Sequence, residues 1–349
     1  MLKELAIILV VPALPAGAQW SAQQSGTNAE FRGLSVVSPT VVWASGTRGR
    51  VAHTTDGGAT WTIDTVSGAD SLDLRAIHAR SATRAWTSSA GPAEQHQAKI
   101  FATTNGKEWH LQFATTDSGV FLDAMAFWDE RHGIAMSDPV AGRLFLLATS
   151  DGGATWTRIP TRNAPPVLPG EAAFAASGTC IVVQGTSNVW IGTGGGARAR
   201  VFRSNDRGRT WHVADTPLHA GNASSGIFSV AFSDAEHGVI AGGDYQKPKT
   251  PLDNVAVTRD GGKTWTLATG PLPSGYMSAV AYVPGTKSRS LVAVGLAGTA
   301  QSSDAGQSWT MIDTVPYNSV AFTSRDAGWA VGPRGRIARW KPATPVTRP

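Results

Sequence analysis

An aspartate in the stretch TTDGGATW, residues 54–61, is the first side chain that suggests chemistry. Its carboxylate has the right type for general acid–base catalysis or for binding a metal, and the two glycines after it permit a tight turn. Acid–base catalysis needs two differently tuned groups at one substrate, and calcium needs six to eight oxygen ligands. A single carboxylate satisfies neither requirement, so the surrounding sequence has to decide its role.

The same stretch recurs five more times with the pattern S/T-x-D-x-G-x-T/S-W. Successive copies of its acidic position lie 44 to 55 residues apart, and one shortened copy carries asparagine instead. Each interval holds enough chain for four short strands, and long amphipathic helical stretches are hard to find, so the repeat predicts the blades of a β-propeller. The six positions are Asp56, Asn105, Asp151, Asp206, Asp260 and Asp304.

Four units also carry an inner strand in which Val or Met, Ala and an aromatic residue follow one another, at 125–127, 230–232, 280–282 and 320–322. Because side chains alternate across a strand, the outer two should face one neighbouring blade and the alanine the other. A strand with Trp and Gly comes next, and a third leads into the Asp motif, which is therefore a hairpin turn. Seven inner strands are expected, beginning near Arg32, Arg75, Asp123, Glu171, Ile227, Met277 and Asn318.

The seventh unit ends at 335–342 without a fourth strand, and the missing strand is found near the other end of the chain. Residues 19–25 match 60–66, with Trp20 in the place of Trp61. Pairing these ends would remove an exposed sheet edge. We therefore predict an all-β, seven-bladed β-propeller over residues 19–342 with Asp-box hairpins, closed by the N-terminal strand completing the last blade, and a tail at 343–349.

In this architecture the repeated aspartates have a structural role. Each carboxylate can accept hydrogen bonds from backbone N–H groups of its own turn, and the following Trp can pack between adjacent sheets. The copies lie on different blades, so they do not converge on one substrate. No catalytic residue and no metal site are expected among them.

Residues 1–18 read as a secretory signal peptide, with Lys3, an apolar stretch at 5–14 and Ala16-Gly17-Ala18 before the cleavage point. The apolar stretch is shorter than the roughly 20 residues that span a bilayer, and a buried strand or an uncleaved anchor is the alternative. Export to the periplasm or the extracellular space is expected. Cys180, the sole cysteine, lies in an apolar run that predicts a buried, inert thiol.

Charge and motifs exclude several classes of partner. The net charge of +5 is spread along the chain without a Lys/Arg block, so no nucleic-acid partner is expected. There is no dinucleotide-binding glycine pattern between a strand and a helix, no cysteine pair and no haem motif, so no cofactor is expected. A monomer is expected.

These repeats resemble the Asp-box, or BNR, repeat of sialidases, xyloglucan-degrading glycosidases, sortilin-like receptors and photosystem II stability/assembly factors. The blade pattern from Trp20 to Trp340 is most similar to the last group, and the runs at 170–179, 199–211 and 242–248 resemble its relatives in non-photosynthetic bacteria. The resemblance implies a non-enzymatic protein that binds or assembles other proteins, with arginines on the inner strands. Arg32 and Arg75 match this pattern, whereas Asp123 departs from it and puts a photosystem partner in doubt.

Loops that join blades, and loops that join second to third strands, are where propellers usually bind ligands, and loops on a rigid scaffold concentrate function. The longest such loops are 91–99, 137–143, 192–200 and 243–254, the first of which holds Glu94 and His96. We expect a protein partner to be engaged at this end of the molecule. The candidate binding residues are Arg32, Arg75, Asp123, Asp138, Arg143, Glu171, Arg200, Asp244, Tyr245, Lys247 and Arg336.

Two alternatives remain open at this point. The first is a glycoside hydrolase of the sialidase-like Asp-box type. That family carries an R-I-P motif ahead of its first Asp box, whereas Arg158-Ile159-Pro160 follows the third Asp box here. The second is a propeller that binds carbohydrate without cleaving it, through exposed aromatic residues such as Tyr245, Tyr276 and Tyr317. The absence of a catalytic set in the sequence favours a non-enzymatic role.

Overall fold

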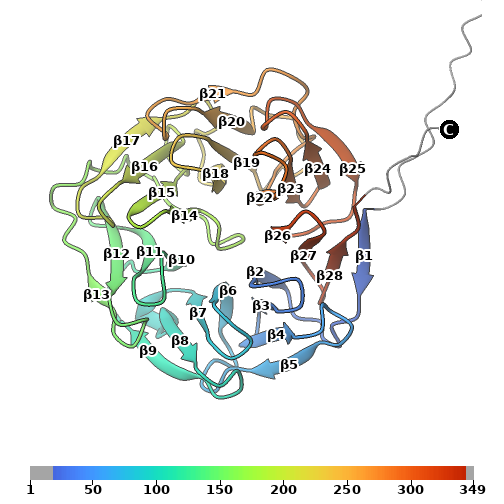
Figure 1. The fold of residues 1–349 in the computed structure, drawn as a ribbon. Coiled ribbons are helices and arrows are strands. Elements are labelled where there is room, and N and C mark those ends of the chain that lie inside the picture. Colours follow the sequence, from blue (N-terminus) through green and yellow to red (C-terminus); the bar gives the residue numbers. More distant parts are fainter. Residues whose placement is uncertain (1–18, 343–349) are drawn as a thin grey trace, which may run out of the picture.

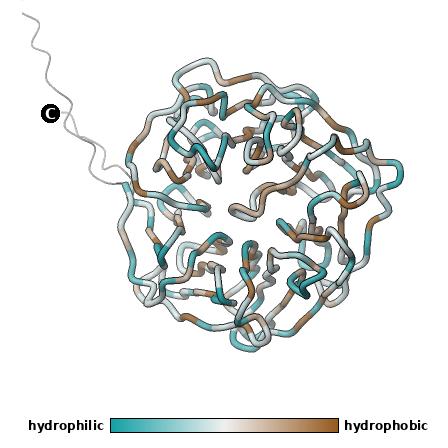
Figure 2. Tube along the Cα trace, turned by 180° about the vertical axis from the view of Figure 1, so that it is seen from behind, coloured by the Kyte–Doolittle hydropathy of each residue, from teal (hydrophilic) through white to brown (hydrophobic). Residues whose placement is uncertain are grey.

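The computed structural model describes residues 19–342, and the predicted signal peptide and C-terminal tail lie outside the described residues. Residues 19–342 form seven four-stranded sheets, all antiparallel within the sheet, arranged as blades around a common axis (Figure 1). Apolar segments recur in every blade around the ring (Figure 2). The predicted seven-bladed β-propeller is confirmed.

The first four blades follow one another along the chain. Blade 1 holds β2 (Phe31–Val36), β3 (Val42–Gly46), β4 (Arg50–Thr54) and β5 (Thr62–Thr65). Blade 2 holds β6 (Asp73–Ala79), β7 (Ala85–Ala90), β8 (Lys99–Thr103) and β9 (His110–Ala114), with the short 3-10 helix η1 (Ala93–Gln95) between β7 and β8. Blade 3 holds β10 (Leu122–Phe127), β11 (Gly133–Val140), β12 (Arg143–Thr149) and β13 (Thr157–Arg158). Blade 4 holds β14 (Ile181–Gln184), β15 (Asn188–Gly192), β16 (Arg200–Ser204) and β17 (His212–Asp215).

The remaining three blades complete the ring. Blade 5 holds β18 (Ser225–Phe232), β19 (Gly238–Asp244), β20 (Val255–Thr258) and β21 (Thr266–Leu267). Blade 6 holds β22 (Ala279–Tyr282), β23 (Leu291–Gly295), β24 (Gly298–Ser302) and β25 (Thr310–Asp313). Blade 7 holds β26 (Ser319–Ser324), β27 (Ala327–Val331), β28 (Ile337–Trp340) and, as its outermost strand, β1 (Trp20–Gln23).

Closure of the ring takes place in blade 7, as the sequence predicts. Strand β1 pairs antiparallel with β28, in a register that sets Trp20 opposite Trp340. The Trp20 ring packs edge-on against Trp340 at 4.9 Å between centroids, and its Nε1 donates to Thr299 Oγ1 of blade 6 at 3.1 Å. The two ends of the propeller are thus joined by backbone pairing and by buried aromatic surface.

The core consists of apolar layers between neighbouring blades. In blade 3, Met125 and Phe127 pack with Trp86 of blade 2, whereas Ala126 belongs to the layer shared with blade 4. This is the alternation predicted for the inner strands. The Trp86 indole also stacks on Phe127 at 4.3 Å and donates to the carbonyl of Gly152 in the Asp box of blade 3. Packing and hydrogen bonding therefore couple each blade to the next.

The Asp motifs form the predicted hairpin turns between third and fourth strands. In blade 3, Thr149 Oγ1 and Thr155 Oγ1 donate to the two carboxylate oxygens of Asp151 at 2.7 and 2.6 Å. The Thr155 N–H adds a third bond, and the Gly153 N–H donates to Thr149 Oγ1. These bonds hold the pKa of Asp151 at about 2, with the Thr155 hydroxyl as the largest cause. A carboxylate held in this way is a turn-stabilising group.

The fourth blade departs from the expected layout. Its inner strand begins at Ile181, not near Glu171, because residues 172–178 leave the sheet and reach toward the axis of the ring (Figure 1). An isolated bridge from Ala172 to Gly194, and one from Gly194 to Gly226, hold the base of this segment. The backbones approach so closely that a Cβ at Gly194 would lie 2.6 Å from the Gly226 Cα. We call residues 172–178 the axial loop.

Candidate functional site

Four inner strands carry a β-bulge at their beginning, and the bulges decide which side chains face the axis. The register shifts lie between Phe31 and Gly33, Leu74 and Ala76, Leu122 and Ala124, and Ile227 and Ser229. A bulge leaves one residue unpaired and re-aims its side chain. The residues at the four bulges are Arg32, Arg75, Asp123 and Phe228, and all four line one cavity.

This cavity, of about 460 Å³, lies at the end of the molecule opposite the Asp boxes. Its walls come from the starts of inner strands, from second-to-third-strand loops and from the axial loop. Its lining has a charged part and an apolar part. The charged part is formed by Glu30, Arg32, Arg75, Asp123 and Asp138, and the apolar part by Phe121, Phe174, Phe228, Tyr245, Tyr276 and Leu296. The combination can bind an extended ligand that has both polar and apolar groups.

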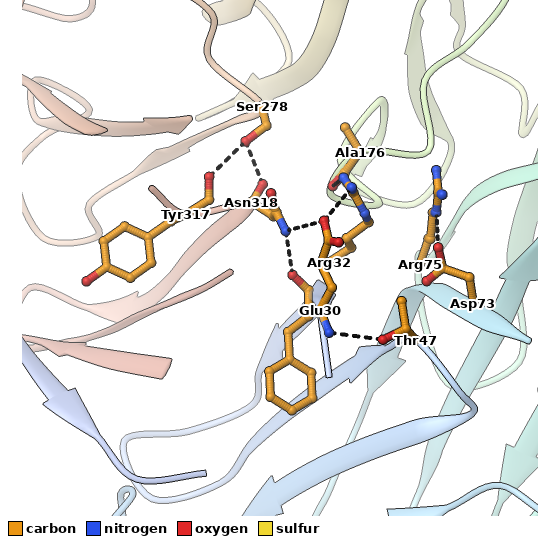
Figure 3. A network of polar contacts seen from close by, with 10 residues as sticks. Glu30, Arg32, Thr47, Asp73, Arg75, Ala176, Ser278, Tyr317 and Asn318 are labelled. Atoms are coloured by element: carbon orange, nitrogen blue, oxygen red, sulfur yellow. Dashed lines mark hydrogen bonds and ion pairs between the residues drawn. The ribbon is translucent and has the colours of Figure 1, made fainter. Parts of the chain in front are cut away.

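The axial loop supplies one wall of the cavity and is fixed by contacts with distant blades. Phe174 stacks on Phe228 with 3.9 Å between centroids. The Ser177 hydroxyl donates to the Ser278 carbonyl at 2.8 Å. Arg32 Nη1 donates to the Ala176 carbonyl at 3.4 Å (Figure 3). The loop is therefore held between blades 1, 5 and 6.

Both arginines are held by carboxylates two residues earlier in the chain. Arg32 Nη2 lies 2.5 Å from Glu30 Oε1, and Arg75 Nε lies 2.6 Å from Asp73 Oδ2 (Figure 3). The Asn318 amide of blade 7 also donates to Glu30, at 3.4 Å. About a quarter to a third of each arginine side chain stays exposed (23% and 31%), so part of each side chain remains accessible from the cavity.

Blade 3 contributes two carboxyl groups to the same cavity. Burial raises the pKa of Asp123 well above its ordinary value, and the neighbouring Asp138 raises it further, while Arg75 acts in the opposite direction. Burial also raises the pKa of Asp138 to about 6, although its carboxylate accepts a hydrogen bond from the Ala173 N–H at 2.9 Å. Near neutral pH the cavity therefore holds protonatable carboxyl groups beside permanently charged guanidinium groups.

Five of the eleven candidate binding residues come together at the cavity: Arg32, Arg75, Asp123, Asp138 and Tyr245. Glu171 and Arg200 instead form a buried ion pair with each other, and Thr193 donates to Glu171 Oε1 at 2.5 Å. Both side chains are more than 90% buried, so the pair fixes the base of the axial loop and is not a free recognition surface.

The other four candidates lie outside the cavity. Asp244 caps its own loop by accepting from Ser224 Oγ and the Gln246 N–H, and Lys247 is exposed on that loop. Arg143, at the start of β12 in blade 3, donates to the Ala164 carbonyl at 2.6 Å. Arg336 donates to the Pro316 carbonyl at 2.7 Å and lies over the ring of Tyr317.

The structure also shows site residues that sequence reasoning missed. Glu30, Phe174 and Phe228 line the cavity, and the repeat did signal Phe228, because it aligns with Arg32 and Arg75 at the start of an inner strand. The prediction that Tyr276 and Tyr317 are exposed is wrong, because they are 4% and 3% exposed and pack against other aromatic rings.

Three further sequence predictions concern possible chemistry outside the cavity. Cys180 is buried, as predicted. The Arg158-Ile159-Pro160 stretch lies at the outer strand β13, where the Arg158 guanidinium covers the ring of Phe145. Within residues 19–342, no cluster of three or more His, Cys, Asp or Glu side chains could hold a metal ion. In the same range, no helix is long and apolar enough to cross a membrane.

Comparisons with known proteins agree with this architecture. No family model and no curated protein matches the sequence. The structure of YCF48 bound to D1 peptide is 16% identical, with a TM-score of 0.64 over 95% of this chain and 99% of that one. YCF48 from Cyanidioschyzon merolae is also 16% identical, with a TM-score of 0.65 over 94% of this chain and all of that one.

An ancestral GH74 enzyme is 14% identical, with a TM-score of 0.61; the match covers 91% of this chain and 46% of that one. At these identities the likeness concerns the fold. The chain is a seven-bladed β-propeller structurally similar to YCF48.

Proposed function

We propose that this protein is a non-enzymatic binding or assembly factor that holds a segment of a partner protein in the cavity at the axis. The observation that carries the proposal is the convergence of Arg32, Arg75 and Asp123 beside an aromatic wall, each aimed inward by a β-bulge. The likeness to a YCF48 structure with a bound peptide supports it. The signal-peptide pattern at 1–18 supports a role outside the cytoplasm.

Physical considerations favour a polypeptide ligand. A cavity of about 460 Å³ accommodates a few residues, and its aromatic side offers apolar contact area for their side chains. Arginine can form two parallel hydrogen bonds to a carboxylate, which fixes orientation as well as charge. The rigid propeller also arranges these groups before binding, so little ordering of the receptor is needed.

The test is affinity capture with the mature chain from a periplasmic extract of the native cells, followed by mass spectrometry. An Arg32→Gln/Arg75→Gln variant should lose the captured partner. The matched control, Arg259→Gln/Arg325→Gln, removes the same charge from exposed turns at the opposite end and should retain it. If both variants capture the same proteins as the unmodified chain, and all three melt alike, the proposed site is wrong.

Glycoside hydrolysis is the second candidate, and one observation favours it. Asp123 and Asp138 lie in one cavity with raised pKa values, as a general acid requires. Glycosidases, however, place their two carboxyl groups on either side of the scissile bond, whereas these come from adjacent strands of one blade and so lie on one wall of the cavity. Turnover of fluorogenic glycosides or sialosides that Asp123→Asn and Asp138→Asn abolish would establish the hydrolase.

A further inference from the structure

The cavity residues at the equivalent bulges differ in charge from blade to blade. Blades 1 and 2 direct Arg32 and Arg75 inward from equivalent bulges, and blade 3 directs Asp123 inward from the same position. Asp138, on the next strand of blade 3, adds a second carboxyl to that wall. A ligand in the cavity therefore meets guanidinium groups paired with carboxylates on blades 1 and 2, and on blade 3 two carboxyl groups that form no ion pair within residues 19–342.

Asp123 has an unfilled hydrogen-bonding capacity. This residue is only 1% exposed, it lines the cavity, and its Oδ2 has no hydrogen-bond partner within residues 19–342. Buried carboxyl oxygens without partners are unfavourable in proteins, because the lost hydration is not replaced. Within the same range, Arg32 Nε is likewise a buried donor without a partner. The lining of the cavity thus holds one carboxyl oxygen and one guanidinium N–H whose hydrogen-bonding capacity is unused within residues 19–342.

We propose that the cavity selects a ligand segment in which a cationic side chain lies next to a carboxylate. The cationic group binds at Asp123 and Asp138, and the carboxylate binds at Arg32 and Arg75. This inference rests on the proposed function and adds the chemistry of the bound segment. Arginine and lysine are the side chains that supply such a cation in a protein partner.

The same arrangement discriminates against simpler ligands. A purely acidic segment would leave Asp123 and Asp138 without a cationic partner, and a purely basic segment would place a positive charge against Arg32 and Arg75. Specificity arises as much from such mismatches as from attractive contacts. Because Asp123 is buried and the two arginines are largely buried, charge–charge interactions at these groups are stronger than in bulk water.

Binding of a cation is also linked to protonation of the carboxyl groups. Burial raises the pKa of Asp138 to about 6, and an adjacent cation lowers it, so binding should release protons near neutral pH. The charged groups facing this wall are Arg75 with Asp73 on β6, and Arg32 with Glu30 at β2. The arginines stay charged between pH 5 and 8, so affinity for the cationic group should fall as pH is lowered from 7.5 to 5.5.

Four blocked nine-residue peptides test the proposal: Gly-Ser-Gly-Phe followed by a variable pair and then Gly-Ser-Gly. The variable pairs are Glu-Lys, Glu-Gln, Gln-Lys and Gln-Gln, and a fluorophore on the N-terminus allows binding to be measured by anisotropy. The Glu-Lys peptide should bind roughly tenfold more tightly than either singly charged peptide, the effect expected for one buried charged contact. Asp123→Asn should remove that advantage while leaving the affinity for the Glu-Gln peptide unchanged or stronger.

Arg259→Gln, in an exposed turn at the opposite end, is the control and should change no affinity. The proposal is overturned if the Glu-Gln peptide binds as tightly as the Glu-Lys peptide, if Asp123→Asn changes neither affinity, or if no peptide binds. The capture experiment distinguishes failure of the mixed-charge preference from failure of the proposed protein-binding function. A partner that is lost in Arg32→Gln/Arg75→Gln but unaffected by Asp123→Asn would show a cavity that binds protein without the mixed-charge preference.

Discussion

Removal of the Trp20 side chain tests the closure of the ring quantitatively. Trp20 is 8% exposed and contacts Trp340 and Tyr317, with centroid distances of 4.9 and 5.7 Å. Replacing it by alanine removes about 150 Å² of buried apolar surface. At 25 cal/mol per Å², this loss lowers the free energy of unfolding by about 4 kcal/mol. The range of about 3 to 5 kcal/mol found for buried Trp→Ala changes agrees with that value.

The assay is thermal unfolding of the mature chain, followed by near-UV circular dichroism. A domain of this size loses about 2 °C in Tm for each kcal/mol, so Trp20→Ala should melt about 8 °C lower. Trp20→Phe keeps the ring contacts but loses the bond to Thr299, and should fall by about 2 °C. Deleting residues 19–26 exposes β28 as a sheet edge and should have a larger effect than either substitution.

An unchanged melting temperature for Trp20→Ala would refute the reasoning. It would mean that β28 is stable as an edge strand and that the β1–β28 pairing contributes little. Equal losses for Trp20→Ala and Trp20→Phe would instead place the stabilisation in the hydrogen bond to Thr299, and the area argument would be wrong.

Three other predictions follow from the contacts. Gln23→Ala should cost about 2 kcal/mol in unfolding free energy by chemical denaturation, because Gln23 Oε1 accepts from the indole N–H groups of Trp61 and Trp329. Asp151→Ala should lower the free energy of unfolding by about 1 kcal/mol at pH 7 without altering partner capture. Because the folded pKa of Asp151 is depressed to about 2, the stabilisation by its carboxylate is present above pH 4 and should disappear as pH falls toward 2. As pH rises from 4 to 7, Asp138→Asn should become more stable relative to the unmodified chain. The folded pKa of Asp138 is raised to about 6, so its ionisation destabilises the unmodified chain in that interval. Melting temperatures of both chains, measured across this pH range, test the direction of the difference.

The arrangement of the cavity shows how a repetitive fold acquires a specific surface. Equivalent bulge positions carry arginine in two blades, aspartate in the third and phenylalanine in the fifth. Blade 4 contributes the axial loop in place of an equivalent strand start. One structural device repeated with different side chains thus produces an asymmetric cavity from seven similar units.

The sequence by itself determined the architecture, because the repeat encodes it. The Asp motifs predicted the hairpins, the inner-strand triplets predicted which side chains face which neighbour, and the match of Trp20 to Trp61 predicted closure. Each of these depends on local hydrogen bonding or on strand periodicity, which are properties of neighbouring residues. The end of the propeller that carries the loops between blades could be identified for the same reason.

Only the tertiary structure decided which residues form the candidate site. Bulges aim Arg32, Arg75 and Asp123 at the axis, whereas Glu171 and Arg200 neutralise each other in the interior. The axial loop looked like an inner strand because its apolar residues are indeed buried, but Phe174 stacks on a ring from another blade. Such outcomes depend on contacts between residues far apart in the chain, so the local pattern cannot specify them.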